Sequence, residues 1–229
     1  MKKNPIIYAL ILTLLLLNPS IPAHSADVQK SDWTVEEVLR NVREREQTLT
    51  TFIAEFKQIQ ENSLFTEAQV SEGTLFFDHN GRLLMKMSAP EAYLIFIEDQ
   101  KMILGVPGSP SYRQKKIPGK KPFLKQMMGI GQLKNQYDIH KTAAPCGETC
   151  ELELRPLKKS RRIPFSSIRA RINTRQWLPE MIHLEEPGGD VTTFHLQFIS
   201  INQPLPEGIF DIPIPDTTSA LPEGNHDIK

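Results

Sequence analysis

The sequence predicts a mainly β protein with a helix near its start, in which many short strands form one curved antiparallel sheet. Three observations support this prediction. From Leu49 onward, apolar and polar residues alternate with a period of two over many short segments, turn residues separate these segments, and one amphipathic stretch precedes them. The chain has 229 residues and no internal repeat, which suits a single all-β domain behind a leader.

The first 25 residues have the three-part layout of a secretory signal peptide. A basic start precedes the apolar run Ile6–Leu17, and small residues follow as far as Ala26. This run has 12 residues, whereas a membrane-spanning helix needs about 20. We therefore expect cleavage after Ser25 rather than an anchored helix, a single domain over residues 26–215, and a disordered tail over residues 216–229.

The charge balance argues against a nucleic-acid partner. Two of the 27 basic residues, Lys2 and Lys3, belong to the leader, so 25 remain against 27 acidic residues. A domain so close to neutral lacks the strongly basic face that nucleic-acid binding usually requires. No cysteine lies near the expected cleavage position to carry a lipid anchor of the protein's own.

An amphipathic helix is predicted from Thr34 to about Thr48. Thr34 and Glu37 form a capping-box pair, which satisfies exposed backbone donors at the start of a helix. Apolar residues recur at helical spacing on one side, namely Val35, Val38, Leu39 and Val42. The other side is charged, so we expect this helix to bury one face on a surface.

Period-two alternation predicts the strands. The first three are expected over residues 51–58, 70–77 and 83–87, with an Asn80–Gly81 hairpin turn between the second and third. Further strands are expected over residues 93–97, 101–106, 137–142, 151–156, 165–173, 181–185 and 191–201. The stretch 107–121 is rich in Pro, Gly, Ser and Lys and is expected to be a mobile loop, and residues 122–133 a short helix.

Seven apolar side chains from the first three predicted strands fall on alternate positions. They are Phe52, Phe56, Leu75, Phe77, Leu83, Met85 and Met87. Two interpretations stay open, because any half-buried sheet shows this alternation. The seven side chains form an ordinary core, or they form one wall of a cavity that holds an apolar ligand.

The two cysteines, Cys146 and Cys150, flank a three-residue segment of turn composition between two predicted strands. In an oxidising compartment such a pair favours a disulfide. The closed loop is small, so the chain-entropy contribution is only about 2 kcal/mol. A redox role or a metal-binding role is the alternative, although no His or carboxylate pattern around them indicates zinc.

The sequence gives little support to an enzyme. Neither G-x-S-x-G nor H-E-x-x-H occurs, and the histidines do not have a spacing typical of a metal site or of a nucleophile's base. We therefore expect no catalytic residues, no metal and no cofactor. Basic residues gather in two stretches, 113–125 and 158–162. They could contact acidic lipid headgroups or partner proteins, or they could be solvated loops.

The order of several motifs resembles the outer-membrane lipoprotein carrier family, which is LolA-like. A Phe52–Gln58 strand of the form F-x-A-x-F-x-Q follows the helix, and Gly73–Phe77 then has the form G-x-L-x-hydrophobic. A strand that ends at Pro90 comes next, and Leu205–Pro213 near the end of the chain also resembles the family. The motifs extend over nearly the whole chain behind the leader.

The resemblance implies an unclosed β-barrel of about eleven antiparallel strands with a helical lid, and a cavity that binds the acyl chains of a lipoprotein. Apolar residues of the segment 122–133 would contribute to the lid, namely Phe123, Met127 and Met128. Methionine suits a surface that repacks around varied ligands, although simple gap-filling is an equal alternative. The resemblance also implies an inner-membrane lipoprotein-releasing transporter as donor and an outer-membrane receptor as acceptor.

The sequence departs from the family pattern at one position. Better-known members carry an Arg-Pro pair after the G-x-L strand, and that Arg bonds to the lid. By spacing, His79 and Asn80 stand there in this chain, and Arg82 follows three residues after His79. His79 and Arg82 are therefore the two candidates for the lid latch.

The resulting hypothesis is a monomeric periplasmic carrier that binds the acyl chains of lipoproteins, or of related lipids, and shuttles them towards the outer membrane. The alternative is an envelope binding or sensing module on the same scaffold, which recognises lipoproteins or envelope proteins without transporting them. A hydrolase is a third and weaker alternative.

Overall fold

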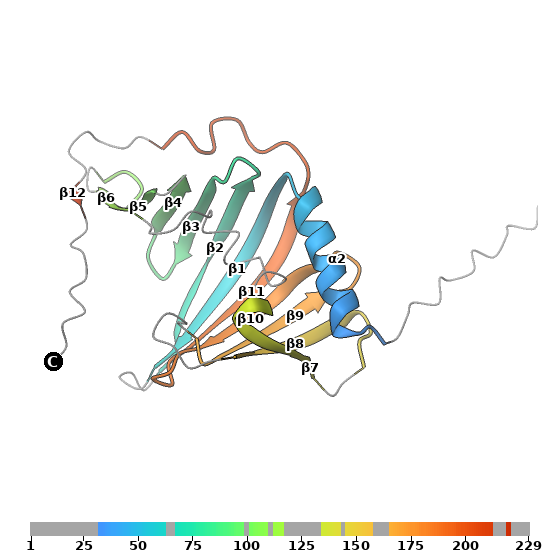
Figure 1. Ribbon diagram of the computed structural model, residues 1–229. Helices are drawn as coiled ribbons and strands as arrows, with labels where there is room; N and C mark the ends of the chain where they lie inside the picture. Colours follow the sequence, from blue (N-terminus) through green and yellow to red (C-terminus); the bar gives the residue numbers. More distant parts are fainter. Residues whose placement is uncertain are drawn as a thin grey trace, which may run out of the picture. The chain divides into compact units, whose positions relative to one another are not determined.

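The computed structural model describes residues 32–62, 67–98, 101–109, 112–116, 134–142, 145–157, 165–212 and 219–220. These residues contain one α-helix, α2 (Val35–Thr48), and one sheet (Figure 1). The predicted signal peptide and the predicted lid segment 122–133 lie outside the described residues. Within the described residues, no helix combines the length and the apolar character needed to cross a membrane.

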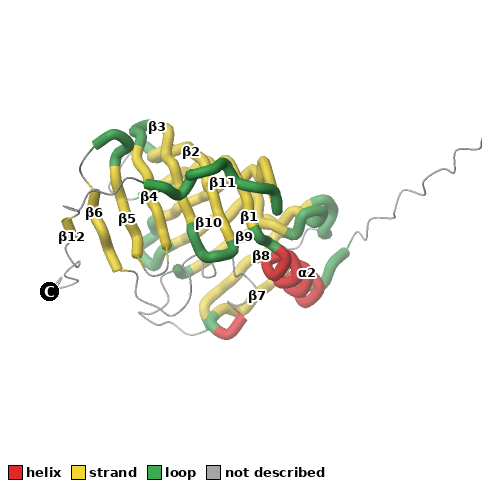
Figure 2. The backbone as a smooth tube through the Cα atoms, turned by 90° about the horizontal axis from the view of Figure 1, so that it is seen from above, coloured by secondary structure: helices red, strands yellow, loops and turns green. Residues whose placement is uncertain are grey.

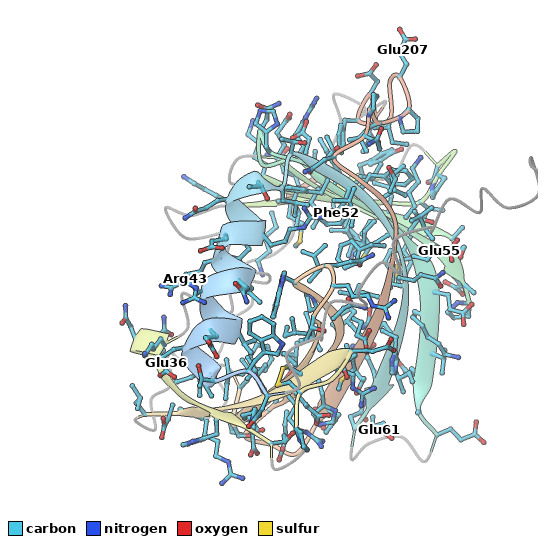
Figure 3. The ribbon with its side chains drawn as sticks, turned by 90° about the vertical axis from the view of Figure 1, so that its right-hand side faces the viewer. Glu36, Arg43, Phe52, Glu55, Glu61 and Glu207 are labelled. Atoms are coloured by element: carbon cyan, nitrogen blue, oxygen red, sulfur yellow. A yellow bond between two sulfur atoms is a disulfide. The ribbon has the colours of Figure 1, made fainter. Side chains whose placement is uncertain are left out.

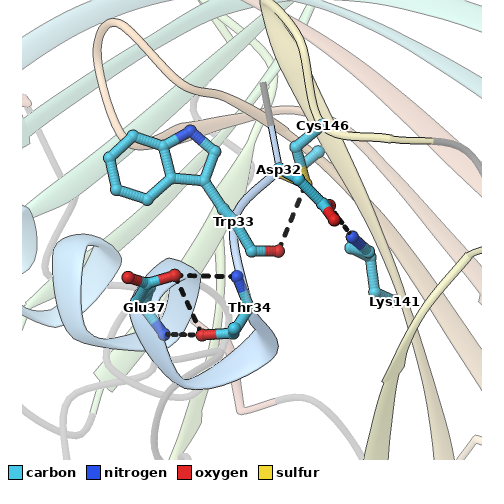
Figure 4. A network of polar contacts seen from close by, with 7 residues as sticks. Asp32, Trp33, Thr34, Glu37, Lys141 and Cys146 are labelled. Atoms are coloured by element: carbon cyan, nitrogen blue, oxygen red, sulfur yellow. Dashed lines mark hydrogen bonds and ion pairs between the residues drawn. A yellow bond between two sulfur atoms is a disulfide. The ribbon is translucent and has the colours of Figure 1, made fainter. Parts of the chain in front are cut away.

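Helix α2 begins where the capping box predicts. The backbone N–H of Glu37 donates to the Thr34 hydroxyl oxygen over 3.3 Å, and the Thr34 N–H donates to the Glu37 carboxylate over 2.9 Å (Figure 4). Two donors that the helix itself cannot satisfy are thereby paired. Just before the helix, Asp32 forms an ion pair with Lys141, which ties the start of α2 to a strand of the sheet.

Eleven strands of the sheet pair antiparallel with one another. Their bounds are β1 Thr51–Glu61, β2 Gln69–Asp78, β3 Leu83–Ala89, β4 Tyr93–Glu98, β5 Lys101–Gly105, β6 Tyr112–Lys116, β7 Tyr137–Lys141, β8 Thr149–Pro156, β9 Ser167–Asn173, β10 Leu178–Glu185 and β11 Val191–Ile201. The order across the sheet is β6-β5-β4-β3-β2-β1-β11-β10-β9-β8-β7, so β1 joins two meanders. In the described part of the chain the two ends of the sheet do not pair with each other, which confirms the predicted unclosed antiparallel sheet.

The predicted loop over residues 107–121 is wrong in part, because Tyr112–Lys116 form strand β6. This strand pairs with β5 from Lys101↔Lys116 to Gly105↔Tyr112. Its sequence, YRQKK, lacks apolar alternation because it lies near the sheet edge and buries only Tyr112, against Gly105. Backbone pairing with β5, which composition does not reveal, therefore determines its structure.

The end of the chain contributes a twelfth strand. Ser219–Ala220 form β12, which pairs in parallel with Arg113 and Gln114 of β6. These two residues belong to the tail 216–229, which the sequence predicts to be disordered, and the rest of that tail lies outside the described residues. The edge strand β6 is therefore covered over two residues by the chain itself.

The two faces of the sheet carry different cores. We call the face that meets α2 the inner face and the opposite one the outer face, and the sheet curves around α2 (Figure 3). Val38, Leu39 and Val42 of α2 pack on apolar side chains of β7–β10, such as the fully buried Leu152 and Leu154. Figure 2 also shows α2 on the β7–β9 side of the sheet.

The predicted disulfide is present between Cys146, in the connection from β7 to β8, and Cys150 of β8. Both cysteines are buried in the same cluster as the apolar face of α2. The Cys146 sulfur lies 3.9 Å from the carbonyl oxygen of Trp33, and the Trp33 ring meets Trp177 edge-on at 5.0 Å (Figure 4). The disulfide therefore lies beneath the start of α2.

A close approach of two strands supplies the first prediction. A Cβ atom on Gly73 of β2 would lie 2.1 Å from the backbone oxygen of Lys86 and 2.9 Å from the Phe56 ring. We expect Gly73→Ala to lower the free energy of unfolding by about 3 kcal/mol, because strand β3 cannot move away without loss of its pairing.

Gly188→Ala is the matched control for Gly73→Ala, because a Cβ atom there would meet nothing within 4 Å. Urea unfolding of both variants measures the difference. Equal stability of the two variants would contradict the close approach of β2 and β3.

Candidate functional site

The seven side chains predicted to share one face of the sheet do so. The strand register pairs Phe52 with Phe77, Leu75 with Met85 and Phe77 with Leu83. All seven belong to one apolar cluster on the inner face, which we call the inner wall, together with Ala54 and Ile97. The Phe52 and Phe77 rings stack with their centroids 5.0 Å apart. Whether they also contact a lipid stays a prediction.

The inner wall extends to strands for which the sequence did not assign a face. Tyr93 and Ile95 of β4 and Met102 of β5 continue it on one side, and three residues of β11 continue it on the other, namely Phe194, Leu196 and Phe198. Their alternation is visible in the sequence. Alternation defines two faces but does not say which of them meets β1, and that information lies in the strand register.

Part of the inner wall is only half-buried. Phe77, Met85, Tyr93, Ile95 and Met102 keep some exposure, whereas Phe52 is 3% exposed and Phe56 is 4% exposed. Half-buried apolar side chains gathered on a curved face are typical of a surface that binds an apolar partner. Burial also raises the pKa of the Tyr93 hydroxyl above its ordinary value.

The outer face of β2–β6 is covered by the chain that follows β11. Leu84, Leu94 and Phe96 form a second core there, which packs against Phe210 and against the neighbouring Ile209 and Ile212. The Phe96 and Phe210 ring centroids lie 6.0 Å apart. The segment 209–212 thus hides apolar surface on the outer face, and it belongs to the stretch 205–213 that carries one of the family motifs.

The structure places the latch candidate Arg82 on the outer face. Its Nε donates to the Asp78 carboxylate over 2.8 Å, and its guanidinium carbon lies 4.5 Å from the centroid of the Phe210 ring. Burial alone would raise the pKa of Asp78, but the hydrogen bonds and charge of Arg82, with Asn80, hold that pKa below its usual value. Arg82 therefore fastens the segment 209–212 to the turn between β2 and β3.

The other latch candidate, His79, is exposed in this same turn. Its backbone N–H donates to the Thr50 carbonyl oxygen over 2.7 Å. The lid segment 122–133, with Phe123, Met127 and Met128, lies outside the described residues. A latch between that segment and His79 or Arg82 accordingly stays a prediction.

A hollow on the outer face is polar. It has a volume of about 660 Å³ and is lined by charged and polar side chains of β1, β2, β10 and β11, including Glu55, Lys57, Glu72, Glu180 and His195. Lys57 and Glu72 are cross-strand neighbours in this lining and form an ion pair at 3.6 Å. Figure 3 shows Glu55 on the side of the sheet away from Phe52. Such a lining suits water rather than acyl chains.

His183 on the outer face is engaged by neighbouring protein side chains. The His183 ring lies 2.8 Å from Arg169 and 3.0 Å from the Thr193 hydroxyl, and burial together with Arg169 lowers the pKa of His183. Among the described residues, no group of three His, Cys, Asp or Glu side chains could hold a metal ion.

Basic residues of β6 line the edge of the sheet. The register pairs Arg113 with Leu104 and Lys115 with Met102, so both exposed side chains belong to the inner face. The remaining basic residues of the two predicted clusters, in 117–125 and 158–162, lie outside the described residues.

These features define an unclosed β-sheet. The segment 209–212 packs on its outer face, and its apolar inner face meets helix α2. The chain belongs to the family described as outer membrane lipoprotein carrier protein LolA, which matches residues 47–213. By its description, this family consists of carrier proteins. Comparison with curated proteins found no match.

Several solved structures are similar to this chain at low sequence identity. An uncharacterized conserved protein from Thermus thermophilus is 10% identical with a TM-score of 0.51, over 81% of this chain and 97% of that chain. A LolA superfamily protein from Nitrosomonas europaea is 10% identical with a TM-score of 0.41, over 78% and 97%. The lipoprotein LppX from Mycobacterium tuberculosis is 8% identical with a TM-score of 0.45, over 76% and 99%. At 10% identity, the likeness to the Thermus protein shows the fold alone.

One ionisable group of α2 yields a prediction about pH. Burial raises the pKa of Glu46 from 4.5 to about 7, while the charge of Arg43 acts in the opposite direction. Between about pH 4.5 and pH 7 the folded protein then binds more protons at Glu46 than the unfolded chain does. The Glu46 contribution to stability should therefore fall as pH rises through this window and change no further above it.

Glu46→Gln tests this prediction, because the amide is a neutral substitute. We expect the variant to be more stable than the wild type by about 1–2 kcal/mol at pH 8, a value reduced from the full shift because water screens part of the carboxyl group. At pH 4 the two proteins should unfold at the same urea concentration. The same difference at both pH values would show that Glu46 is not buried in this way.

Proposed function

We propose that the chain is a periplasmic carrier that binds the acyl chains of lipoproteins, or of related lipids, on its inner wall and shuttles them towards the outer membrane. The observation that carries this proposal is the continuous apolar inner wall, half-buried at Phe77, Met85, Tyr93, Ile95 and Met102, in a chain of the lipoprotein carrier family.

The physical need for such a surface is large. Each buried methylene contributes about 0.8 kcal/mol, so three long acyl chains exposed to water cost roughly 30 kcal/mol. A carrier must cover these chains and still release them. Phe, Met and Ile side chains bury apolar surface without directional bonds. An acyl chain bound to them can therefore leave for another apolar surface without breaking specific hydrogen bonds.

The proposal includes a route and a compartment. The signal peptide 1–25 is cleaved, the domain 26–215 acts as a monomer in the periplasm, an inner-membrane lipoprotein-releasing transporter supplies the cargo, and an outer-membrane receptor accepts it. The helical lid would include Phe123, Met127 and Met128. Support for this route comes from the family and from the leader-like sequence of the first 25 residues.

The direct test begins with mass spectrometry of the purified mature protein, in which we expect co-purifying acyl lipid. The protein should then extract a lipoprotein from inner-membrane vesicles into solution. Binding to the vesicles without release of soluble cargo would favour the sensing module instead. Lipid-free protein that also takes up no fluorescent fatty acyl probe would contradict the proposal.

A charge placed on the inner wall should weaken lipid binding more than stability. We expect Met85→Lys to reduce the affinity for a fluorescent fatty acyl probe by about tenfold or more, because an acyl chain would have to desolvate the ammonium group. Ile199→Lys is the matched control, because Ile199 of β11 is 55% exposed and lies outside the inner wall.

Probe titration and thermal unfolding of both variants give the comparison. The control should bind like the wild type. If Met85→Lys also bound like the wild type while it remained folded, the acyl chains would not lie on this wall.

A further inference from the structure

The apolar stripe of α2 ends in two charged side chains. Val38, Leu39 and Val42 are buried against the sheet. Positions three and four residues further along a helix lie on the same face, and in α2 these positions are Arg45 and Glu46. The next residue of the stripe is Leu49, which belongs to the inner wall. Arg45 and Glu46 thus lie on the face of α2 that meets the inner face of the sheet.

Other charged residues of α2 point elsewhere. Glu36, Arg40 and Arg43 are exposed, and Figure 3 shows Glu36 and Arg43 on the side of the helix away from the sheet. In contrast, Arg45 and Glu46 are both partly buried. Charged side chains on the solvent face of a helix need no explanation, but two that interrupt its apolar face do.

Two polar atoms of this pair are buried, one on each side chain. The Nε of Arg45 and the Oε1 of Glu46 have no hydrogen-bond partner in the part of the chain that the structure describes. A buried donor or acceptor that has lost water and gained no partner destabilises the protein. A ligand that supplied the missing partners would relieve this cost, and the relief would add to its affinity.

The acyl ligand of the proposed function brings a suitable group. Each acyl chain joins its head through a carbonyl, as an ester or an amide, and the carbonyl oxygen accepts hydrogen bonds. The Arg45 Nε–H can donate to it, and so can the Glu46 carboxyl group when protonated. The pKa of Glu46 lies at about 7. Near neutral pH, this carboxyl group therefore carries a proton in a large fraction of the molecules.

From this geometry, and resting on the proposed function, we infer that Arg45 and Glu46 form a binding site for the ester or amide carbonyl of an acyl ligand, at the end of α2 next to the inner wall. The chains would lie on the inner wall and their carbonyl groups at this pair. Both residues lie outside the segment 47–213 that matches the family.

The test compares two ligands that differ only in the carbonyl. Dioctanoylglycerol has two ester carbonyls, and dioctylglycerol has ether oxygens on the same chains. Displacement of a fluorescent fatty acyl probe from the mature protein measures both affinities. We expect the wild type to bind the ester about tenfold more tightly than the ether. An N-octanoyl amide of serinol tests the amide form of the same group.

Four variants make the comparison specific. Glu46→Leu and Arg45→Met should bring the ratio of ester to ether affinity close to one while the ether affinity is retained. Glu46→Gln should keep part of the ratio, because its amide N–H can still donate. Arg40→Met on the exposed side of α2 is the matched control and should keep the whole ratio. Thermal unfolding shows that each variant is folded, and Glu46→Leu removes an unpaired polar atom, so it should fold.

The outcomes separate this site from the proposed function. Equal affinity of the wild type for ester and ether, or an unchanged ratio in Glu46→Leu and Arg45→Met, would overturn the carbonyl site and leave acyl binding intact. Failure of both ligands to displace the probe would contradict acyl binding itself, and the carbonyl site with it.

Discussion

The pairing of β1 on both of its edges is the constraint on which the rest of the structure depends. β1 pairs with β2 from Thr51 to Gln60 and with β11 from Phe52 to Glu61, so one strand joins the two meanders. Its inner side carries Phe52, Ala54 and Phe56, all at most 4% exposed. If this strand shifted by one residue, its apolar side chains would move to the outer face and the inner wall would be lost.

An irregularity in the same pairing accompanies the curvature of the sheet. The register between β1 and β11 shifts between Ile53 and Ala54, where Ile199 is left without a partner on β1. An extra residue of this kind bends a strand and increases its twist. The inner face is therefore concave around α2, and side chains from β1–β5 and β11 converge on it.

The two faces of the sheet are completed by different means. On the outer face the segment 209–212 covers part of the sheet, because Phe210 packs on Phe96. Arg82 forms a hydrogen bond with Asp78 and lies over the Phe210 ring. On the inner face α2 covers β7–β10, and among the described residues the inner wall remains half-buried at Met85 and Ile95. Under the proposed function, the inner face is the one that binds a partner, and an acyl chain is a partner of matching chemistry.

The sequence predicts those parts of the structure that depend on local chemistry. The capping box of Thr34, the disulfide of Cys146 and the alternation around Phe52 are each defined by a few neighbouring residues, and each prediction is confirmed. The fold class followed from the order of such elements together with a family resemblance, and the family match confirms that resemblance.

Features that depend on distant pairing could not be predicted in this way. Strand β6 has no apolar alternation and exists because β5 pairs with it. The outer-face position of Arg82 depends on the register of β3 and on the return of Phe210 from the far end of the chain. Arg45 and Glu46 look like ordinary charged helix residues until the helix packs on the sheet, and only then does their burial become apparent.

One measurement tests the central claim most directly, because methionines lie on both faces of the sheet. Met85 and Met102 belong to the inner wall, and Met181 of β10 pairs with His195, whose side chain lines the outer hollow. The NMR signals of methyl-labelled methionines should be recorded with a fatty acyl chain that carries a spin label near its end. The account predicts strong broadening at Met85 and Met102 and little at Met181. Broadening at Met181 with unchanged signals at Met85 and Met102 would contradict it.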